Sequence, residues 1–280
     1  MKSIKLIYTL IFALGILNFG FAQVKDKIKG NRDVTIKQTY VDDFTSLVIK
    51  DDFEVKIAFN SKPSVEVEAD DNLHEVIDIN VDAGVLSISS SKRISTKKKL
   101  IITVNYSESL GNIELYNDVE LRSLTSMELA NLNLKIQNNS RAYLNIKSNT
   151  FKFNGSDKTK SRLNITADSS SFVMSDNSKL DALLNGMTSS FDLYQNTDAT
   201  IEGQSEDTIL RLDNSANFIG KNYSVKNAEV LIESISDLSL SVEMLLLLKA
   251  SGNSETYIYG EPKIELQLFT DTAKLQKKKK

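Results

Sequence analysis

Residues 172–198 read FVMSDNSKLDALLNGMTSSFDLYQNTD, and this stretch contains the pattern that decides the fold. A short strand of alternating apolar residues is followed by a turn of Asn, Asp, Ser or Thr, and then by another strand. Turns of this kind recur at Asn138-Asn139-Ser140, Asp176-Asn177-Ser178, Asn196-Thr197-Asp198, Asp213-Asn214-Ser215, Ser236-Asp237, Gly252-Asn253-Ser254 and Thr270-Asp271-Thr272. From Ser178 onward their last residues are roughly 17 to 22 apart, a period that is typical of a solenoid.

The period and the short strands predict an all-β chain, and in particular a right-handed parallel β-helix. Alternation predicts that inward side chains stack into apolar columns, for which the candidates are Ile136, Phe153, Ile165, Leu193, Leu212, Ile232 and Ile258. The turn residues then have a structural role, because Asn and Asp tolerate left-handed backbone and short polar side chains bond to nearby backbone groups. A β-sandwich is the alternative, since strands at about 8–12-residue spacing also fit that class.

Strand length divides residues 23–272 into two regions. Residues 23–106 hold longer strands separated by hairpin-like turns, and residues 107–272 hold the β-helix repeats. Because an open solenoid end exposes unpaired backbone groups, we expect the first region to cap one end. Residues 273–280 end in four lysines and are interpreted as a frayed basic tail that does not extend the sheet.

Residues 1–22 have the pattern of a signal peptide. A short basic stretch precedes a mostly apolar run from Leu6 to Phe19, and Gly20-Phe21-Ala22 supplies small residues before a mature start at Gln23. The apolar run is shorter than the roughly 20 residues of a spanning helix, so an uncleaved membrane anchor is the less favoured interpretation. We therefore expect an exported protein, in the periplasm, on the cell surface or outside the cell, with no stable membrane insertion.

Composition restricts the partners. The chain has 280 residues, a net charge of −3 and no cysteine, which excludes a lipid-modified cysteine anchor and disulfides. Loss of the two lysines of the signal peptide makes the mature chain still more acidic. This acidity argues against nucleic acid as the main partner.

Several stretches resemble the head GIN domain family of putative auto-transporter adhesins, which are secreted proteins of Bacteroidetes-type bacteria. The resemblance lies in residues 41–49, 52–57, 63–73, 84–88, 250–254 and 257–264, and it extends over about residues 35 to 272. It implies a β-helix-like fold, export and an adhesive or cell-surface role, with no catalytic residues to carry over. The chain departs from the family in its turns, where Asn, Asp and Ser replace the usual Ser-Gly repeats.

Residues for enzyme chemistry are few. His74 is the single histidine and the chain has no cysteine, so a Cys–His dyad or a clustered His/Cys zinc site is impossible. Carboxylates recur at the turns, but no glycine-spaced calcium loop occurs, and we interpret them as solvated turns. The spacing of Arg122, Arg141, Arg162 and Arg211 does not bring them together with a set of carboxylates. We expect no enzyme, no cofactor and no metal; a carbohydrate-active enzyme on the same scaffold and a structural envelope protein are the alternatives.

Aromatic residues are the better candidates for binding. Alternation places Tyr257 and Tyr259 on one side of a strand and Ile258 on the other. If Ile258 points inward, both tyrosines lie on an outer face, where their rings can stack on a sugar or on a protein partner. We therefore predict Tyr257 and Tyr259 as ligand-binding residues and a glycan or cell-surface protein as the partner, and the oligomeric state stays open.

Overall fold

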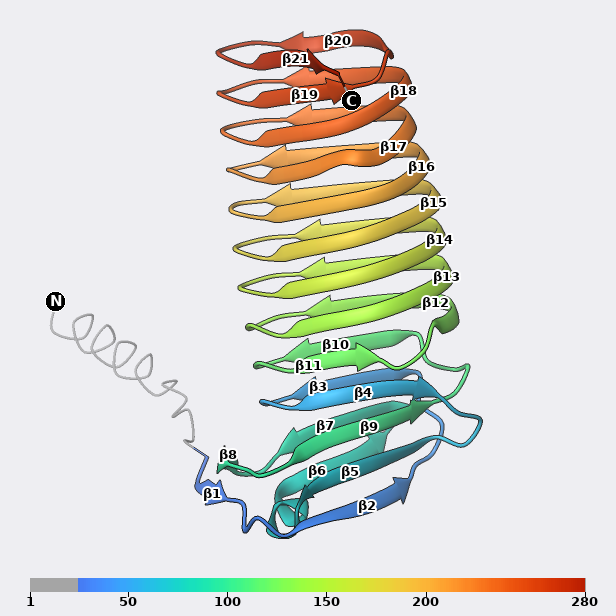
Figure 1. Ribbon diagram of the computed structural model, residues 1–280, viewed down its shortest axis with the longest axis vertical. Helices are drawn as coiled ribbons and strands as arrows, with labels where there is room; N and C mark the ends of the chain where they lie inside the picture. Colours follow the sequence, from blue (N-terminus) through green and yellow to red (C-terminus); the bar gives the residue numbers. More distant parts are fainter. Residues whose placement is uncertain (1–24, 280) are drawn as a thin grey trace, which may run out of the picture.

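The computed structural model describes residues 25–279, so the predicted signal peptide lies outside the described residues. These residues form a β-solenoid of about nine turns, drawn in Figure 1 as an elongated column of stacked rungs. Apart from the 3-10 helix Asp71–Val76, the regular elements of the described chain are strands. They are β1 (Lys27–Lys29), β2 (Val34–Tyr40), β3 (Ser46–Lys50), β4 (Glu54–Phe59), β5 (Ser64–Asp70), β6 (Ile77–Asp82), β7 (Val85–Ser90), β8 (Arg93–Thr96), β9 (Leu100–Tyr106), β10 (Asn112–Tyr116), β11 (Glu120–Ser123), β12 (Met127–Ile136), β13 (Arg141–Gly155), β14 (Lys160–Met174), β15 (Lys179–Tyr194), β16 (Asp198–Asp213), β17 (Asn217–Ile232), β18 (Asp237–Ala250), β19 (Glu255–Tyr259), β20 (Lys263–Phe269) and β21 (Lys274–Lys278).

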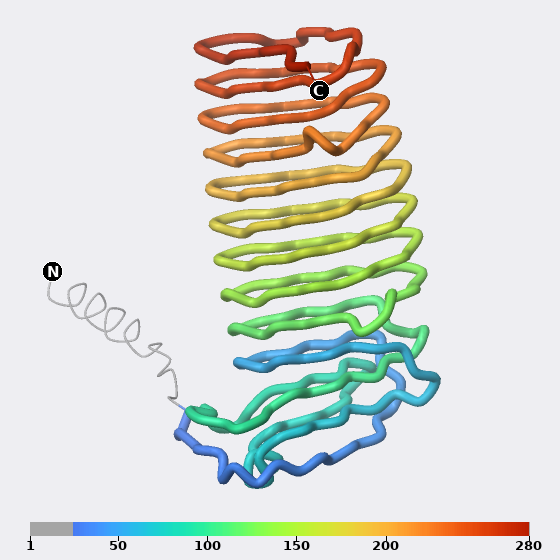
Figure 2. The backbone as a smooth tube through the Cα atoms, viewed as in Figure 1, coloured from blue at the N-terminus to red at the C-terminus, as the bar shows by residue number. Residues whose placement is uncertain are grey.

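Each long strand from β13 to β18 supplies most of one rung. Residue Arg141 of β13 pairs with Lys160 of β14, and Lys160 pairs with Lys179 of β15, so the register advances by 19 residues per rung here. The strand passes over one side of the column, bends near its middle and returns over the other side, as the flattened loops in Figure 2 show. We call the outer surface of the first half face one and that of the second half face two. The parallel β-helix is thus confirmed, and the β-sandwich is not the fold.

Apolar side chains fill the interior in columns, as the alternation predicts. The seven predicted core residues are all buried, with at most 2% of any of them exposed. An aromatic column runs through three successive rungs, where Phe153 is in register with Phe172 and Phe172 with Phe191. The rings of Phe172 and Phe191 stack with centroids 4.6 Å apart and planes within 6°. Burial of these rings is a main source of stability, since each aromatic side chain removes a large apolar area from water.

The polar turns stack in a column of their own. Asn138, Asp157, Asp176 and Asp271 all have left-handed backbone, with φ between 53° and 63°. The backbone N–H of Asp157 donates to the Asp176 carboxylate at 3.2 Å, and the N–H of Gly252 donates to that of Asp271 at 2.9 Å. Asp157, Asp176 and Asp271 therefore each accept an N–H of the rung below, which gives these turn residues the structural role that the sequence predicts.

The N-terminal strands cap the column by an interleaved path. Strands β3 and β4 form a rung that lies between β7–β9 on one side and β10–β11 on the other. Beyond β7 and β9 the pairing becomes antiparallel, through β6 on one side and through β5 and then β2 on the other. The predicted cap is confirmed. The boundary expected at residue 106 does not separate two bodies, because one sheet holds both sets of strands.

A buried carboxylate fastens this cap. Asp70 is fully buried and accepts hydrogen bonds at 3.1 Å from the backbone N–H groups of Arg32, Lys98 and Lys99. Burial alone would raise the pKa of the Asp70 carboxyl, but these donors hold it below its usual value. One ionised side chain therefore holds two separate segments of the cap, at Arg32 and at Lys98–Lys99, against the end of β5.

The C-terminal lysines do not fray as expected. Residues Lys274–Lys278 form β21, which pairs in parallel with β19. Leu275 is half-buried against the core, while Lys274 lies outside and bonds to Glu255 at 2.8 Å. The expectation was wrong because the unpaired edge of β19 recruits this segment, and its lysine stems project beside the sheet without disturbing the backbone ladder.

Candidate functional site

Tyr257 and Tyr259 lie where alternation predicts. Both are half-buried on the outer surface of β19, and Ile258 between them is fully buried. The hydroxyl of Tyr257 donates to Glu255, and this hydrogen bond together with burial raises the pKa of Tyr257. The ammonium of Lys278 lies 4.9 Å from the centroid of the Tyr257 ring. This ring is therefore already engaged with a cation from β21, which a stacking ligand would have to displace.

A second cluster lies on face one, several rungs away. Register places Arg122 beside Tyr143, Tyr143 beside Arg162 and Arg162 beside Asp181, so these four side chains form one row across neighbouring rungs. The Arg122 guanidinium lies 4.0 Å from the centroid of the Tyr143 ring, and Arg162 is 3.9 Å from the Asp181 carboxylate. Together they border a shallow hollow of about 680 Å³, which we call the Tyr143 groove.

Amide and charged side chains complete the Tyr143 groove. Asn145 and Asn164 lie beside the row and are in register with one another on β13 and β14. Outside the hollow, a parallel row beside it carries Glu120, Arg141 and Lys160, in which Arg141 is 3.6 Å from Glu120. The groove therefore offers guanidinium donors, amide donors and acceptors, and carboxylates on a rigid strand surface.

Sequence reasoning missed this cluster and treated its arginines as scattered. The structure corrects that expectation for three of them, because Arg122, Arg141 and Arg162 lie on three neighbouring rungs of face one. Arg211 lies in the second half of β16 on face two, away from the others. The signal was present in the spacing, since residues about one period apart in a solenoid are neighbours in space.

The ionisable side chains that could support catalysis or a metal lie apart. His74 is in the 3-10 helix of the cap, where Thr35 Oγ1 lies 3.0 Å from its Nε2 and where burial, with Lys37 nearby, lowers its pKa. Within residues 25–279 no group of three or more His, Asp or Glu side chains is placed to hold a metal ion. The carboxylates of the turn column are instead used as acceptors for backbone N–H groups.

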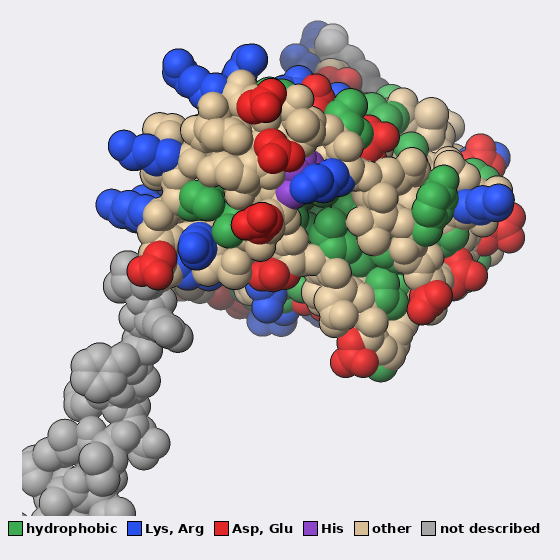
Figure 3. All heavy atoms as spheres, turned by 90° about the horizontal axis from the view of Figure 1, so that it is seen from below, with side chains coloured by type: hydrophobic (Ala, Val, Ile, Leu, Met, Phe, Trp, Pro, Cys, Tyr) green, Lys and Arg blue, Asp and Glu red, His purple; other side chains and the backbone are tan. Residues whose placement is uncertain are grey.

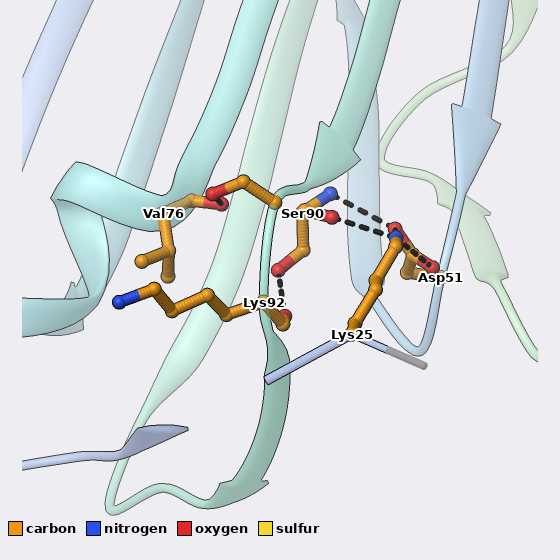
Figure 4. Close-up of polar contacts among 6 residues, drawn as sticks. Lys25, Asp51, Val76, Ser90 and Lys92 are labelled. Carbon is orange, nitrogen blue, oxygen red and sulfur yellow. Dashed lines mark hydrogen bonds and ion pairs between the residues drawn. The ribbon is translucent and has the colours of Figure 1, made fainter. Parts of the chain in front are cut away.

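Another hollow, of about 790 Å³, lies at the N-terminal end of the column. At its wall the Lys25 ammonium contacts Asp51 at 2.9 Å and the carbonyl of Ser90 at 2.6 Å, while the Ser90 N–H donates to the Asp51 carboxylate at 2.9 Å (Figure 4). The Ser90 hydroxyl also donates to the carbonyl of Lys92. These mutual contacts give the residues a structural role, since they hold the start of the described chain against β7.

Figure 3 views this N-terminal end directly. Lysine and arginine side chains project along one side of it, and hydrophobic side chains are exposed among acidic ones elsewhere. Ile36 and Tyr40 of the outermost strand β2 are 62% and 69% exposed. Among the described residues no helix is long and apolar enough to cross a membrane.

Comparisons with known proteins agree with this fold. A family model described as "Putative auto-transporter adhesin, head GIN domain" matches residues 43–183 and 149–262. The structure of a putative adhesin from Parabacteroides merdae is similar, with a TM-score of 0.65 and 17% identity over 90% of this chain and 99% of that one. A putative adhesin from Parabacteroides distasonis gives 0.66 and 17% over 91% and 98%.

A third similar structure carries a different description. It is a putative lipid binding protein from Parabacteroides distasonis, with a TM-score of 0.62 and 16% identity over 90% of this chain and 99% of that one. No curated protein matches the sequence. At these identities the similar structures establish the fold and leave the ligand open.

Proposed function

The chain belongs to the family described as "Putative auto-transporter adhesin, head GIN domain", and from this we propose that it is an exported, non-enzymatic, adhesin-like binding module. Its ligand is a glycan or a protein on a cell surface, and its binding surfaces are the outer faces of the solenoid. The family description names adhesion and no catalytic activity. The protein works in the periplasm, on the cell surface or outside the cell.

The observation that carries this proposal is the contrast between the interior and the faces. The interior is packed with side chains such as Phe151, Phe172 and Phe191, which are at most 1% exposed. A ligand, including a lipid of the kind named for one similar structure, would therefore have to bind outside. On the faces, outward side chains stand in rows about 4.8 Å apart, the spacing of hydrogen-bonded strands. Such rows are preorganised, which lowers the entropy cost of binding an extended partner.

Tyr257 and Tyr259 remain proposed contacts within this function. Their rings lie on the outer surface of β19, next to the C-terminal edge formed by β20 and β21. Aromatic rings in such a position can stack on the apolar face of a sugar. Because the Tyr257 ring is partly engaged by Lys278, we expect Tyr259 to contribute at least as much to binding.

A binding assay tests the proposal directly. The mature chain is applied to a glycan array and to whole cells, and the double substitution Tyr257→Ala with Tyr259→Ala is expected to reduce the bound fraction. Tyr40→Ala is the matched control, since Tyr40 is an exposed tyrosine of the distant cap. If the mature chain binds neither glycans nor cells, the proposed function is wrong. If the double variant binds as well as the control, the tyrosine site is wrong.

A further inference from the structure

Charge is distributed in bands along the solenoid. Residues 129–167 contain seven Lys or Arg and one acidic residue, a net charge of +6 within a chain whose total is −3. Residues 168–243, which follow directly, contain four Lys or Arg and thirteen Asp or Glu, a net charge of −9. The basic band corresponds to β12, β13 and the first half of β14, and the acidic band begins in the second half of β14. We call this basic band the belt; it lies within the solenoid body of a net-acidic protein, separate from the basic residues 92–99 and 273–280.

The belt overlaps the Tyr143 groove on face one. Arg141 and Lys160 stand side by side in one row, and Arg162 stands in the next row beside Tyr143. Side-chain exposure is 51% for Arg141 and 74% for Arg162. Lys160 is exposed and forms no ion pair with another described residue. Arg141 and Arg162 have only long ion pairs, at 3.6 Å to Glu120 and 3.9 Å to Asp181, whereas Lys179 one rung later is held by Asp198 at 2.7 Å. A ligand can therefore reach the belt cations more easily than Lys179.

The neighbouring side chains make the belt more than a charged surface. The Arg122 guanidinium is held over the Tyr143 ring and by Glu120 at 2.6 Å, so its orientation is fixed before a ligand arrives. The amides of Asn145 and Asn164 can both donate to and accept from hydroxyl groups. Guanidinium groups favour carboxylate or sulfate partners, because two of their N–H groups can donate to two oxygens of one partner.

We propose that the Tyr143 groove, together with the adjoining row of Arg141 and Lys160, binds an acidic polysaccharide. Its carboxylate or sulfate groups lie on Arg162, Lys160 and Arg141, and its hydroxyls on Asn145 and Asn164. This inference rests on the proposed function and names its ligand class. The belt is narrow, since two rungs occupy about 10 Å, close to the Debye length at physiological salt. The acidic band beside it therefore repels a polyanion that runs along the column axis, and the sugar chain lies parallel to the strands instead.

Other polyanions fit the groove less well. Single-stranded nucleic acid is usually held by aromatic side chains that stack on successive bases. The one aromatic ring bordering the groove, Tyr143, is already covered by Arg122. A second copy could place its acidic band on the belt, but carboxylates of that band such as Asp198 and Glu206 are already paired with lysines of their own chain. Amides aligned across two rungs match hydroxyl-rich sugars better than either alternative.

The test measures binding of the mature chain to an immobilised polyuronate, a sulfated polysaccharide, a neutral glucan and DNA, at low and at high salt. The variant Lys160→Gln with Arg162→Gln removes two belt charges. The control Lys221→Gln with Lys226→Gln removes the same charge from exposed sites in the acidic band. We expect the belt variant to lose about tenfold in affinity for an acidic polysaccharide, as for two exposed charge contacts of about 0.7 kcal/mol each. The control should bind within about twofold of the parent chain, and the neutral glucan should not bind.

The possible outcomes separate the two proposals. Equal binding by the belt variant and its control overturns the inference, and so does a preference for the neutral glucan; either result leaves the proposed function standing. Binding to DNA as tight as to polysaccharide also overturns it, since it would indicate general polyanion attraction. Dimers in sedimentation that disappear in the belt variant would assign the belt to a second copy. Absence of binding to any glycan or to cells would overturn both proposals.

Discussion

Asp176 provides the sharpest separation between a structural and a ligand-binding role for the turn column. Its φ is 63°, and its carboxylate accepts hydrogen bonds from the Asp157 N–H at 3.2 Å and from the Ser175 hydroxyl at 2.9 Å. Asp176→Ala loses the acceptor, which costs about 0.5–1.5 kcal/mol. It also places alanine in left-handed backbone, which adds about 1 kcal/mol. We therefore expect the free energy of unfolding to fall by about 1.5–2.5 kcal/mol.

Two further substitutions at the same position divide this effect into its causes. Asp176→Gly keeps the favourable backbone but loses the acceptor, and should cost about 1 kcal/mol. Asp176→Asn keeps both an acceptor and tolerance of left-handed backbone, and should change stability by less than about 0.5 kcal/mol. Urea unfolding followed by circular dichroism ranks the variants. Equal midpoints for the Ala and Asn variants would refute the hydrogen-bonded turn column.

Other parts of the fold make predictions of their own. Phe172→Ala should cost about 3–5 kcal/mol in urea unfolding, because it removes a buried ring from the aromatic column, whereas Phe269→Ala, at 41% exposure on the last rung, should cost far less. The pKa of Asp70 is lowered in the folded state. Its contribution to the free energy of unfolding is therefore fully present above the ordinary aspartate pKa, and it is lost as the pH falls through the lowered pKa of the folded protein. The difference in stability between the parent chain and Asp70→Asn, measured by thermal unfolding, should therefore narrow below about pH 4. A constant difference would contradict an ionised Asp70 carboxylate in the folded cap. Gly252→Ala should destabilise the last rungs, because φ is 71° and a Cβ would lie 2.6 Å from the Ser234 carbonyl oxygen; an unchanged melting temperature would count against this.

The local features of the fold were predictable because they repeat. Turn residues such as Asp176 and inward residues such as Leu193 recur with a period that reveals a solenoid without knowledge of any distant contact. The path of the cap was not predictable in the same way. Strands β3 and β4 lie between β7–β9 and β10–β11, and nothing in their local sequence encodes a pairing with strands that come later in the chain.

The Tyr143 groove depends on register, which turn spacing does not fix. Spacing between turn residues varies from roughly 17 to 22, whereas a row such as Arg122, Tyr143 and Arg162 requires the pairing to be known residue by residue. The orientation of Tyr257 and Tyr259 needed only the alternation of a single strand and was predicted correctly. The C-terminal lysines were misjudged because composition describes the side chains, while the open backbone of β19 determines the pairing.

The central claim is that the faces of the solenoid bind and the turns only support them. The most direct measurement compares binding of the mature chain to acidic polysaccharide and to whole cells for Arg162→Gln, on face one, and Asp176→Asn, in the turn column. The account predicts weaker binding for the face variant and unchanged binding for the turn variant, with both folded by circular dichroism. Unchanged binding of the face variant together with loss in the turn variant would contradict it.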